Sequence, residues 1–171
     1  MSGQKKSAIK VLTTAAMLTA LSAAIGILCK NYFTFNIYRV TFENMPVILS
    51  GLLFGPAVGA GVGACADVIS CISSVNPNVN PIITLGAASV GALAGTVPYI
   101  IRRKGKMQTA VAVALAHLIG QVAIKSVGKM RYFSMPWQGI FVGLAISVVV
   151  GVIEFGLINW LRSSRGISRY L

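Results

Sequence analysis

The sequence contains very little negative charge. Three of its 171 residues are acidic, against fifteen lysines and arginines and a single histidine. Two of the acids, Asp67 and Glu154, lie within apolar stretches, and we expect them toward opposite ends of the fold. An enzyme active site among apolar helices needs a nucleophile with a base, or a pair of carboxylates. The scarcity of acids argues against such a site, and we predict that the chain is not an enzyme.

Motifs for metals, disulfides and phosphates are also lacking. Cys29, Cys65 and Cys71 are odd in number and form no CxxC or Cys/His spacing, so neither a disulfide framework nor a zinc site is indicated. The GAGVG run at 59–63 has no GK[ST] after it and no strand before it, so we interpret it as a packing feature rather than a phosphate loop. We expect no metal and no cofactor.

Apolar residues dominate instead. Hydrophobic residues make up 56% of the chain and charged residues 11%, with a mean hydropathy of +0.79. These values are outside the range of ordinary soluble domains and predict an all-α integral membrane protein. We expect one domain, residues 1–171, built as a bundle of six transmembrane helices. The predicted helices occupy residues 8–28, 44–54, 57–72, 82–101, 108–128 and 137–161.

The basic residues lie in short clusters between apolar runs, as the positive-inside rule describes, so we expect a lipid bilayer and no nucleic acid as a partner. With the N-terminus inside, six helices place ten of the fifteen cations on the inner side, which predicts cytoplasmic termini. The five outer cations are Lys30, Arg39, Lys125, Lys129 and Arg131. Because few acids are available to balance them, they favour an anionic ligand that enters from outside.

Small residues recur at helical spacing. Gly51 with Gly55, and Gly59 with Gly63, form two stripes where helix backbones can approach closely in lipid. In the first helix, residues Ala16, Ala20 and Ala24 form a similar stripe. Between the first two helices, residues 30–42 alternate in polarity, which predicts a short extended or hairpin segment. Its aromatic residues fit either an interfacial belt or a stacking surface for a flat ligand.

Polar residues inside the helices are candidates for a binding site. An aspartate at membrane depth costs about 2.5 to 3.5 kcal/mol unless it is paired or wetted. Asp67 therefore either receives a ligand or forms an internal pair with Lys125 or Arg39. His117, Gln121 and Lys125 follow one another at intervals of four and share a helix face. They fit the wall of a wetted cavity, although a lone histidine is also a common packing residue.

A longer pattern resembles a known family. It comprises Arg39, Phe42, Pro46, Gly51, Gly55-Pro56, Gly59, Gly63, Asp67, Pro81, Thr84-Leu85-Gly86, Gly91 and Gly95. Over nearly the whole chain it is similar to the folate-specific S-components, of FolT type, of energy-coupling factor (ECF) vitamin transporters. The resemblance implies a substrate-binding subunit in a prokaryotic cell membrane that works with a transmembrane coupling subunit and two cytoplasmic ATPases. It also implies that the Ala16, Ala20 and Ala24 stripe docks on the coupling subunit.

The candidate residues fit a pterin with a glutamate tail. Asp67 would accept the N–H donors of the pterin, with Gln121 and His117 nearby. Aromatic faces are offered by Tyr32, Phe35, Tyr38, Tyr132 and Trp137. The tail carboxylates would pair with Arg39, Lys125, Lys129 and Arg131. The connection after the third helix, NPNVNP at 76–81, lacks an aromatic residue, which departs from the family pattern. The alternatives are an S-component for another anionic vitamin, such as pantothenate, and a structural membrane subunit.

Overall fold

The computed structural model describes residues 2–35, 38–39, 41–75, 77, 79–102, 105–134 and 136–163. Within these ranges, the side chains of residues 2–7, 34–35, 38–39, 133 and 162–163 lie outside the description. This leaves the side chains of the predicted site residues Phe35, Tyr38 and Arg39 outside the described part of the chain.

The described residues form six helical rods, the number that the sequence predicts. Their elements are α1 (Ser2–Tyr32), α2 (Asn44–Phe54), α3 (Pro56–Ile72), α4 (Pro81–Ile100), α5 (Lys106–Leu115), η1 (Ala116–Ile124), α6 (Lys125–Phe133) and α7 (Gly139–Ser163). Elements α5, η1 and α6 follow one another without a break, and η1 is a π-helix. Four rods are long and apolar enough to cross a membrane, whereas α2 and α3 are shorter apolar helices.

Three predicted helix boundaries differ from the structure by four or more residues. The first helix begins at Ser2 rather than at residue 8. The first helix does not stop at residue 28 but continues to Tyr32, so the residues expected to begin the extended segment are helical. The fifth helix does not stop at Gly128 but continues to Phe133. A Cβ at Gly128 would lie 3.1 Å from the Ile83 side chain, so this glycine serves helix packing rather than helix termination.

Two short strands lie between α1 and α2. Strand β1 (Thr34–Phe35) pairs antiparallel with β2 (Tyr38–Arg39), with Thr34 opposite Arg39 and Phe35 opposite Tyr38. A second break, between α2 and α3, falls at Gly55, whose φ of 90° favours glycine, and Pro56 then begins α3 at a position where its missing N–H is harmless.

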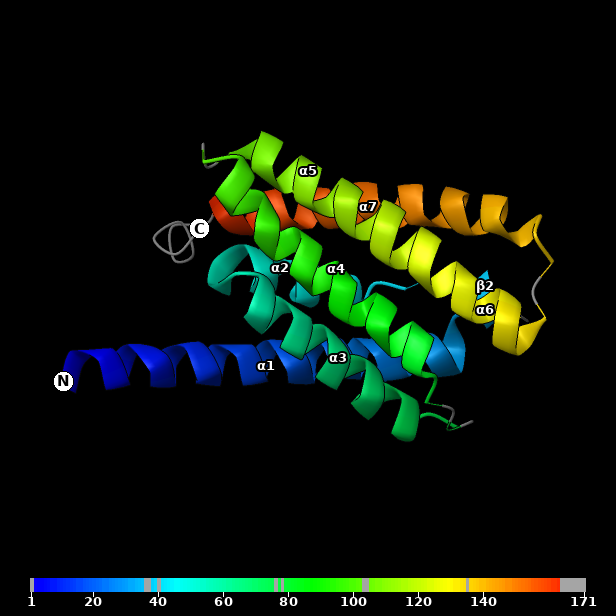
Figure 1. Ribbon diagram of the computed structural model, residues 1–171, viewed down its shortest axis with the longest axis horizontal. Helices are drawn as coiled ribbons and strands as arrows, with labels where there is room; N and C mark the ends of the chain where they lie inside the picture. Colours follow the sequence, from blue (N-terminus) through cyan, green and yellow to red (C-terminus); the bar gives the residue numbers. More distant parts are fainter. Residues whose placement is uncertain are drawn as a thin grey trace.

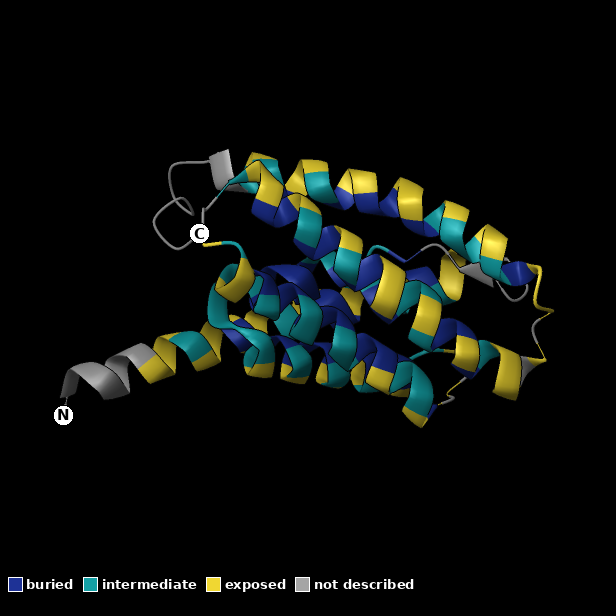
Figure 2. Ribbon diagram, turned by 45° about the horizontal axis from the view of Figure 1, so that its top comes forward, coloured by how far each residue is buried: buried dark blue, intermediate teal, exposed yellow. Residues whose placement is uncertain are grey.

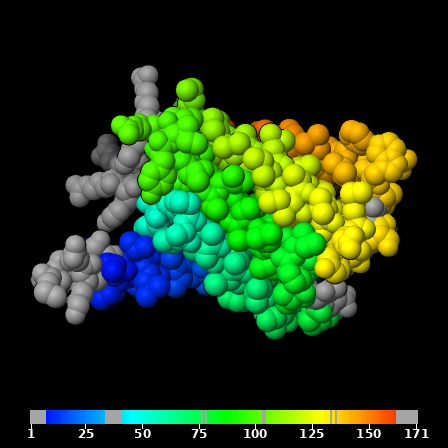
Figure 3. Space-filling model, in the orientation of Figure 1, coloured from blue at the N-terminus to red at the C-terminus, as the bar shows by residue number. Residues whose placement is uncertain are grey.

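Helix α4 occupies the middle of the bundle. It packs against α2 and α3 on one side and against the rod of α5, η1 and α6 on the other. Figure 1 shows α1 along one edge and α7 along the opposite one, with the start of α1 and the end of α7 at the same end of the molecule. The space-filling view shows α4 running between α3 and α6 across this face (Figure 3).

The glycine stripes pack α2 and α3 against α4. A Cβ added at Gly51, Gly59 or Gly91 would overlap the main chain of a neighbouring helix. Gly95 is equally close to the Gly55–Pro56 turn, where the nearest main-chain atoms would lie 2.5 Å from an added Cβ. An added Cβ would lie closer to these main-chain atoms than van der Waals contact allows. The absence of a Cβ at these glycines therefore sets the distance between the three helices.

Candidate functional site

Asp67 lies buried in α3, beside Lys30 in the last turn of α1. Figure 1 shows that α1 and α6 end at the same end of the bundle. The Lys30 ammonium, in the last turn of α1, is 3.5 Å from Asp67 Oδ1, and the two side chains are 9% and 2% exposed. Lys30 Nζ also donates to Ser70 Oγ at 2.6 Å and to Cys71 Sγ at 2.8 Å. Thr84 Oγ1, from α4, donates to Asp67 Oδ2 at 2.8 Å. Side chains from two other helices, α1 and α4, therefore contact the Asp67 carboxylate of α3.

A second buried pair joins Glu43 and Lys125. Lys125 Nζ lies 3.6 Å from Glu43 Oε1, with the two side chains 2% and 8% exposed. The Glu43 main-chain carbonyl accepts a hydrogen bond from Ser22 Oγ at 2.6 Å, which ties the start of α2 to α1. The Lys125 stem crosses Gly86, where an added Cβ would lie 2.6 Å from its Cγ. The buried position of the Lys125 side chain thus requires a glycine at position 86 in α4.

The two pairs approach each other at Gly26 in α1. A Cβ added there would lie 2.7 Å from Glu43 Oε2 and 3.1 Å from Ser70 Oγ. Ser70 is also the closest partner of the Lys30 ammonium. Among the described residues, two cations, Lys30 and Lys125, and two anions, Asp67 and Glu43, are therefore gathered in one buried region.

Gln121 extends this region toward the segment before α2. Its Nε2 donates to Thr41 Oγ1 at 2.7 Å, and its Oε1 accepts from Asn44 Nδ2 at 3.4 Å. Both partners are buried. Gln121 therefore links η1 to the chain that leaves the β1–β2 segment.

His117 lies apart from these contacts, against α7. Its Nε2 is 2.8 Å from Glu154 Oε2, and both side chains are almost fully buried, at 6% and 0% exposed. His117 also lines a cavity of about 300 Å³ between the α5–η1 rod and α7, whose other walls are apolar except for Ser147. Neither Gln121 nor Lys125 lines this cavity. The three residues predicted to form one cavity wall therefore have three different partners.

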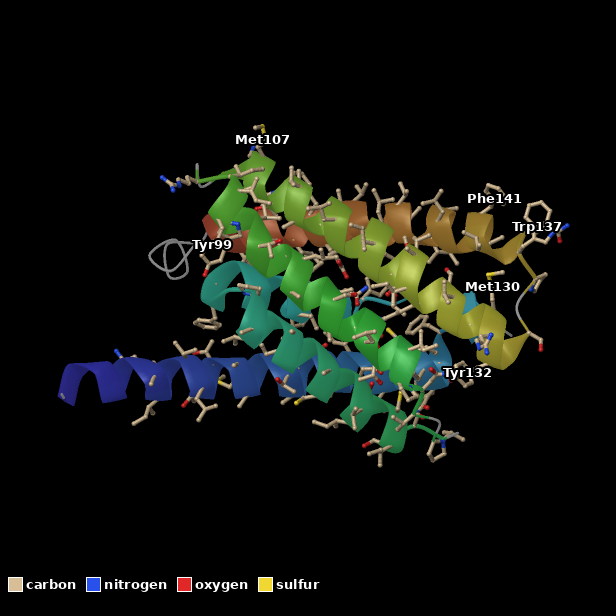
Figure 4. The ribbon with its side chains drawn as sticks, in the orientation of Figure 1. Tyr99, Met107, Met130, Tyr132, Trp137 and Phe141 are labelled. Carbon is tan, nitrogen blue, oxygen red and sulfur yellow. The ribbon has the colours of Figure 1, made fainter. Side chains whose placement is uncertain are left out.

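The remaining predicted ligand residues lie near or on the surface at this end. Arg131, Tyr132, Trp137 and Tyr32 are exposed, and Lys129 is half-buried. The Trp137 ring meets Phe141 edge to face, with the ring centroids 6.2 Å apart. Figure 4 shows Tyr132 and Trp137 at this end and Tyr99 at the other, as expected of residues at two membrane interfaces.

Sequence reasoning missed the direct partners of Asp67. The internal pair expected with Lys125 is wrong, because Lys125 meets Glu43 and Lys30 meets Asp67. In the sequence, Thr84 belongs only to the pattern that resembles the family. Lys30 is one of the five outer cations, and this position is the one sequence signal that points to it as a partner of Asp67.

The alanine stripe of α1 lies on the surface. Ala16, Ala20 and Ala24 are all exposed, whereas Ala15 and Ala23 beside them are buried. Figure 2 shows exposed and intermediate segments where α1 projects from the bundle. Among the described residues, no group of three or more His, Cys, Asp or Glu side chains is placed to hold a metal ion.

Comparison with known proteins identifies the type of protein. Residues 10–164 match the family model for the substrate-specific component of ECF transporters. Among solved structures, FolT bound with folic acid has a TM-score of 0.69 at 18% identity, covering 88% of this chain and 95% of that one. An S-component for biotin from an ECF-type ABC transporter has a TM-score of 0.68 at 16% identity, covering 99% and 98%. A search of curated proteins found no match.

Proposed function

Because the chain belongs to the family of substrate-specific components of ECF transporters, we propose that it is the folate-binding subunit of such a transporter. It is a transporter component rather than an enzyme. In this proposal, residues 1–171 form a single domain whose six helices lie in a prokaryotic plasma membrane with both termini in the cytoplasm. The common position of the start of α1 and the end of α7 supports that topology (Figure 1).

The observation that carries the proposal is the buried carboxylate of Asp67. A pterin ring presents neighbouring N–H donors, and a carboxylate accepts two such donors in parallel. Asp67 Oδ2 already accepts from Thr84, and a carboxylate oxygen has a second lone pair. Asp67 can therefore bind the ring while Thr84 continues to orient it.

Cations at the same end would receive the glutamate tail of folate. Lys125 is buried, Lys129 is half-buried and Arg131 is exposed, so positive charge continues from the cluster to the surface. We assign Arg39 to the same role, and the ring-stacking role to Phe35, Tyr38 and the exposed aromatic residues Tyr32, Tyr132 and Trp137, with Gln121 beside the ring.

In this assignment the empty protein is self-paired. Asp67 and Lys125 both face residues of the chain, Lys30 and Glu43, and the described cavity lies elsewhere. Folate would bring one donor face and two carboxylates, which can replace both internal partners. The ring donors are neutral and the tail carries two negative charges, so the added charge would be balanced by Lys129 and Arg131, together with Arg39.

The exposed alanine stripe fits the coupling role. Small exposed residues in a transmembrane helix allow another helix to approach closely. We propose that Ala16, Ala20 and Ala24 contact the transmembrane coupling subunit, which two cytoplasmic ATPases drive.

Affinity for a panel of vitamins tests the proposal. The purified full chain is titrated with folate, a pterin that lacks the tail, pantothenate and biotin. We expect folate to bind most tightly, followed by the tail-less pterin. The fold is about as similar to the biotin S-component as to FolT. Tighter binding of biotin or pantothenate than of folate would therefore show that folate is not the substrate. Failure of all four to bind would show that the substrate is a different compound.

A further inference from the structure

The Lys30 ammonium is held mainly by groups other than the Asp67 carboxylate. Its distances to Ser70 Oγ and Cys71 Sγ are 2.6 and 2.8 Å, but its distance to Asp67 Oδ1 is 3.5 Å. A charge-assisted N–H···O bond to a carboxylate usually measures about 2.7 to 2.9 Å. Lys30 therefore neutralises Asp67 by proximity, while its hydrogen bonds anchor it next to the carboxylate.

The two oxygens of Asp67 differ in the strength of their contacts. Oδ2 accepts the short bond from Thr84, at 2.8 Å. Oδ1 faces the Lys30 ammonium at 3.5 Å and the Cys71 thiol, a weak donor, at 3.8 Å. A stronger donor that arrived at Oδ1 would displace only these long contacts and would leave the Thr84 bond in place.

A counter-ion at this position is necessary when the site is empty. A carboxylate that is almost fully buried is strongly destabilised without a nearby cation. Lys30 can supply the charge and still move, because it lies in the last turn of α1, directly before the β1–β2 segment. Ser70 and Cys71 offer the ammonium a place to stay when it leaves Oδ1.

We propose that Lys30 is a resident competitor for Asp67, which the N–H donors of a ligand ring displace from Oδ1. This inference rests on the proposed function, since it takes Asp67 as the residue that binds the ring. A ligand with one donor regains only the contact that it breaks, whereas a ring with two adjacent donors gains a second bond. Lys30 therefore makes the site selective for rings that present two adjacent N–H donors, and it lowers their affinity by the strength of its own contact.

Replacement of Lys30 tests the proposal with the full chain in detergent. Lys30→Met removes the charge and nearly keeps the length. We expect the dissociation constants of folate and of tail-less pterin to fall by about tenfold or more, because the competitor is lost and the ligand relieves an uncompensated carboxylate. The melting temperature of the empty protein should fall as well.

Three controls separate this role from a general structural one. Lys10→Met, an exposed position on the same helix, should change neither affinity nor melting temperature. In an Asp67→Asn background, Lys30→Met should no longer raise affinity, because the two changes act on one contact. If Lys30→Met does not fold, Lys30→Gln removes the charge but keeps a donor for Ser70 and should show the same gain.

The outcomes are distinguishable. If the wild-type chain binds folate and the Lys30 variants bind it with unchanged or weaker affinity, Lys30 is not a competitor and this inference is wrong. A gain that persists in the Asp67→Asn background would also overturn it. If the wild-type chain does not bind folate or pterin, the proposed function fails first and the inference fails with it.

Discussion

The close contact of α3 with α2 and α4 can be tested by one added methyl group. Gly59 faces both neighbouring helices, and a Cβ there would overlap the main-chain oxygen of Gly91 and lie 2.8 Å from the Cα of Gly51. Carbon atoms prefer separations of about 3.5 to 4.0 Å. In Gly59→Ala, α3 must therefore move away by about 0.7 Å or more from both helices, and a gap of that size forfeits roughly a quarter to a half of each contact.

Gly61 provides the matched control, because it lies two residues along the same helix and an added Cβ meets nothing within 4 Å. Both substitutions gain helix propensity, about 0.8 to 1.0 kcal/mol relative to glycine. Overpacking costs about 1 to 3 kcal/mol, occasionally more. Because the propensity gain is common to both variants, we expect Gly59→Ala to be less stable than Gly61→Ala by the overpacking cost, about 1 to 3 kcal/mol.

Thermal unfolding with a thiol-reactive dye measures this difference. Cys29 and Cys71 are buried and become reactive on unfolding, and a Cys65→Ser background removes the exposed thiol. For a chain of this length, each kcal/mol shifts the melting temperature by about 2 to 4 °C, so the melting temperature of Gly59→Ala should be lower by about 2 to 12 °C. Equal melting temperatures would refute the argument that backbone contact sets the helix spacing.

Three further predictions concern separate parts of the molecule. Arg131→Ala should weaken the binding of folate by about tenfold but leave the binding of tail-less pterin unchanged. Equal losses for both ligands would show that Arg131 does not bind the tail. Ala20→Trp should abolish uptake while folate affinity stays within about 1 kcal/mol, whereas Leu21→Trp, exposed on another side of α1, should preserve uptake. His117→Leu should destabilise the fold by about 3 to 5 kcal/mol because it leaves Glu154 buried without a partner, and adding Glu154→Leu should restore most of the loss. Folate affinity of that double variant then shows whether His117 also contributes to ligand binding.

Most helix positions could be predicted from the sequence, because a helix depends on residues that are close together in the chain. The range 44–54 was predicted as it is found, since Pro46 and Gly55 mark its two ends. The glycine spacing likewise predicted where a close approach of backbones occurs, at Gly51 and Gly59, but not that α4 is the partner helix. The outer cations also indicate at which end of the bundle polar residues gather, because Lys125, Lys129 and Arg131 depart from the usual charge distribution across a membrane.

Pairing between distant helices was not predictable in the same way. Lys30 and Asp67 are 37 residues apart in the sequence, and their contact depends on how α1 crosses α3. The pairing of Lys125 with Glu43 likewise depends on how closely α6 approaches α4 at Gly86. The π-helix over Ala116–Ile124 changes the number of residues per turn in the segment that carries His117 and Gln121. No residue type in the sequence predicts it.

Folate binding by Asp67→Asn tests the central claim most directly. The substitution keeps the side-chain volume and an acceptor for Thr84, but it places an amide donor where the ring donors would bind. Titrated beside the wild type, a folded Asp67→Asn chain should lose about 2 to 4 kcal/mol of folate binding, about thirtyfold to several hundredfold in the dissociation constant. Affinity within about threefold of the wild type, a difference under 1 kcal/mol, would show that Asp67 is a structural partner of Lys30 and that the ligand binds elsewhere.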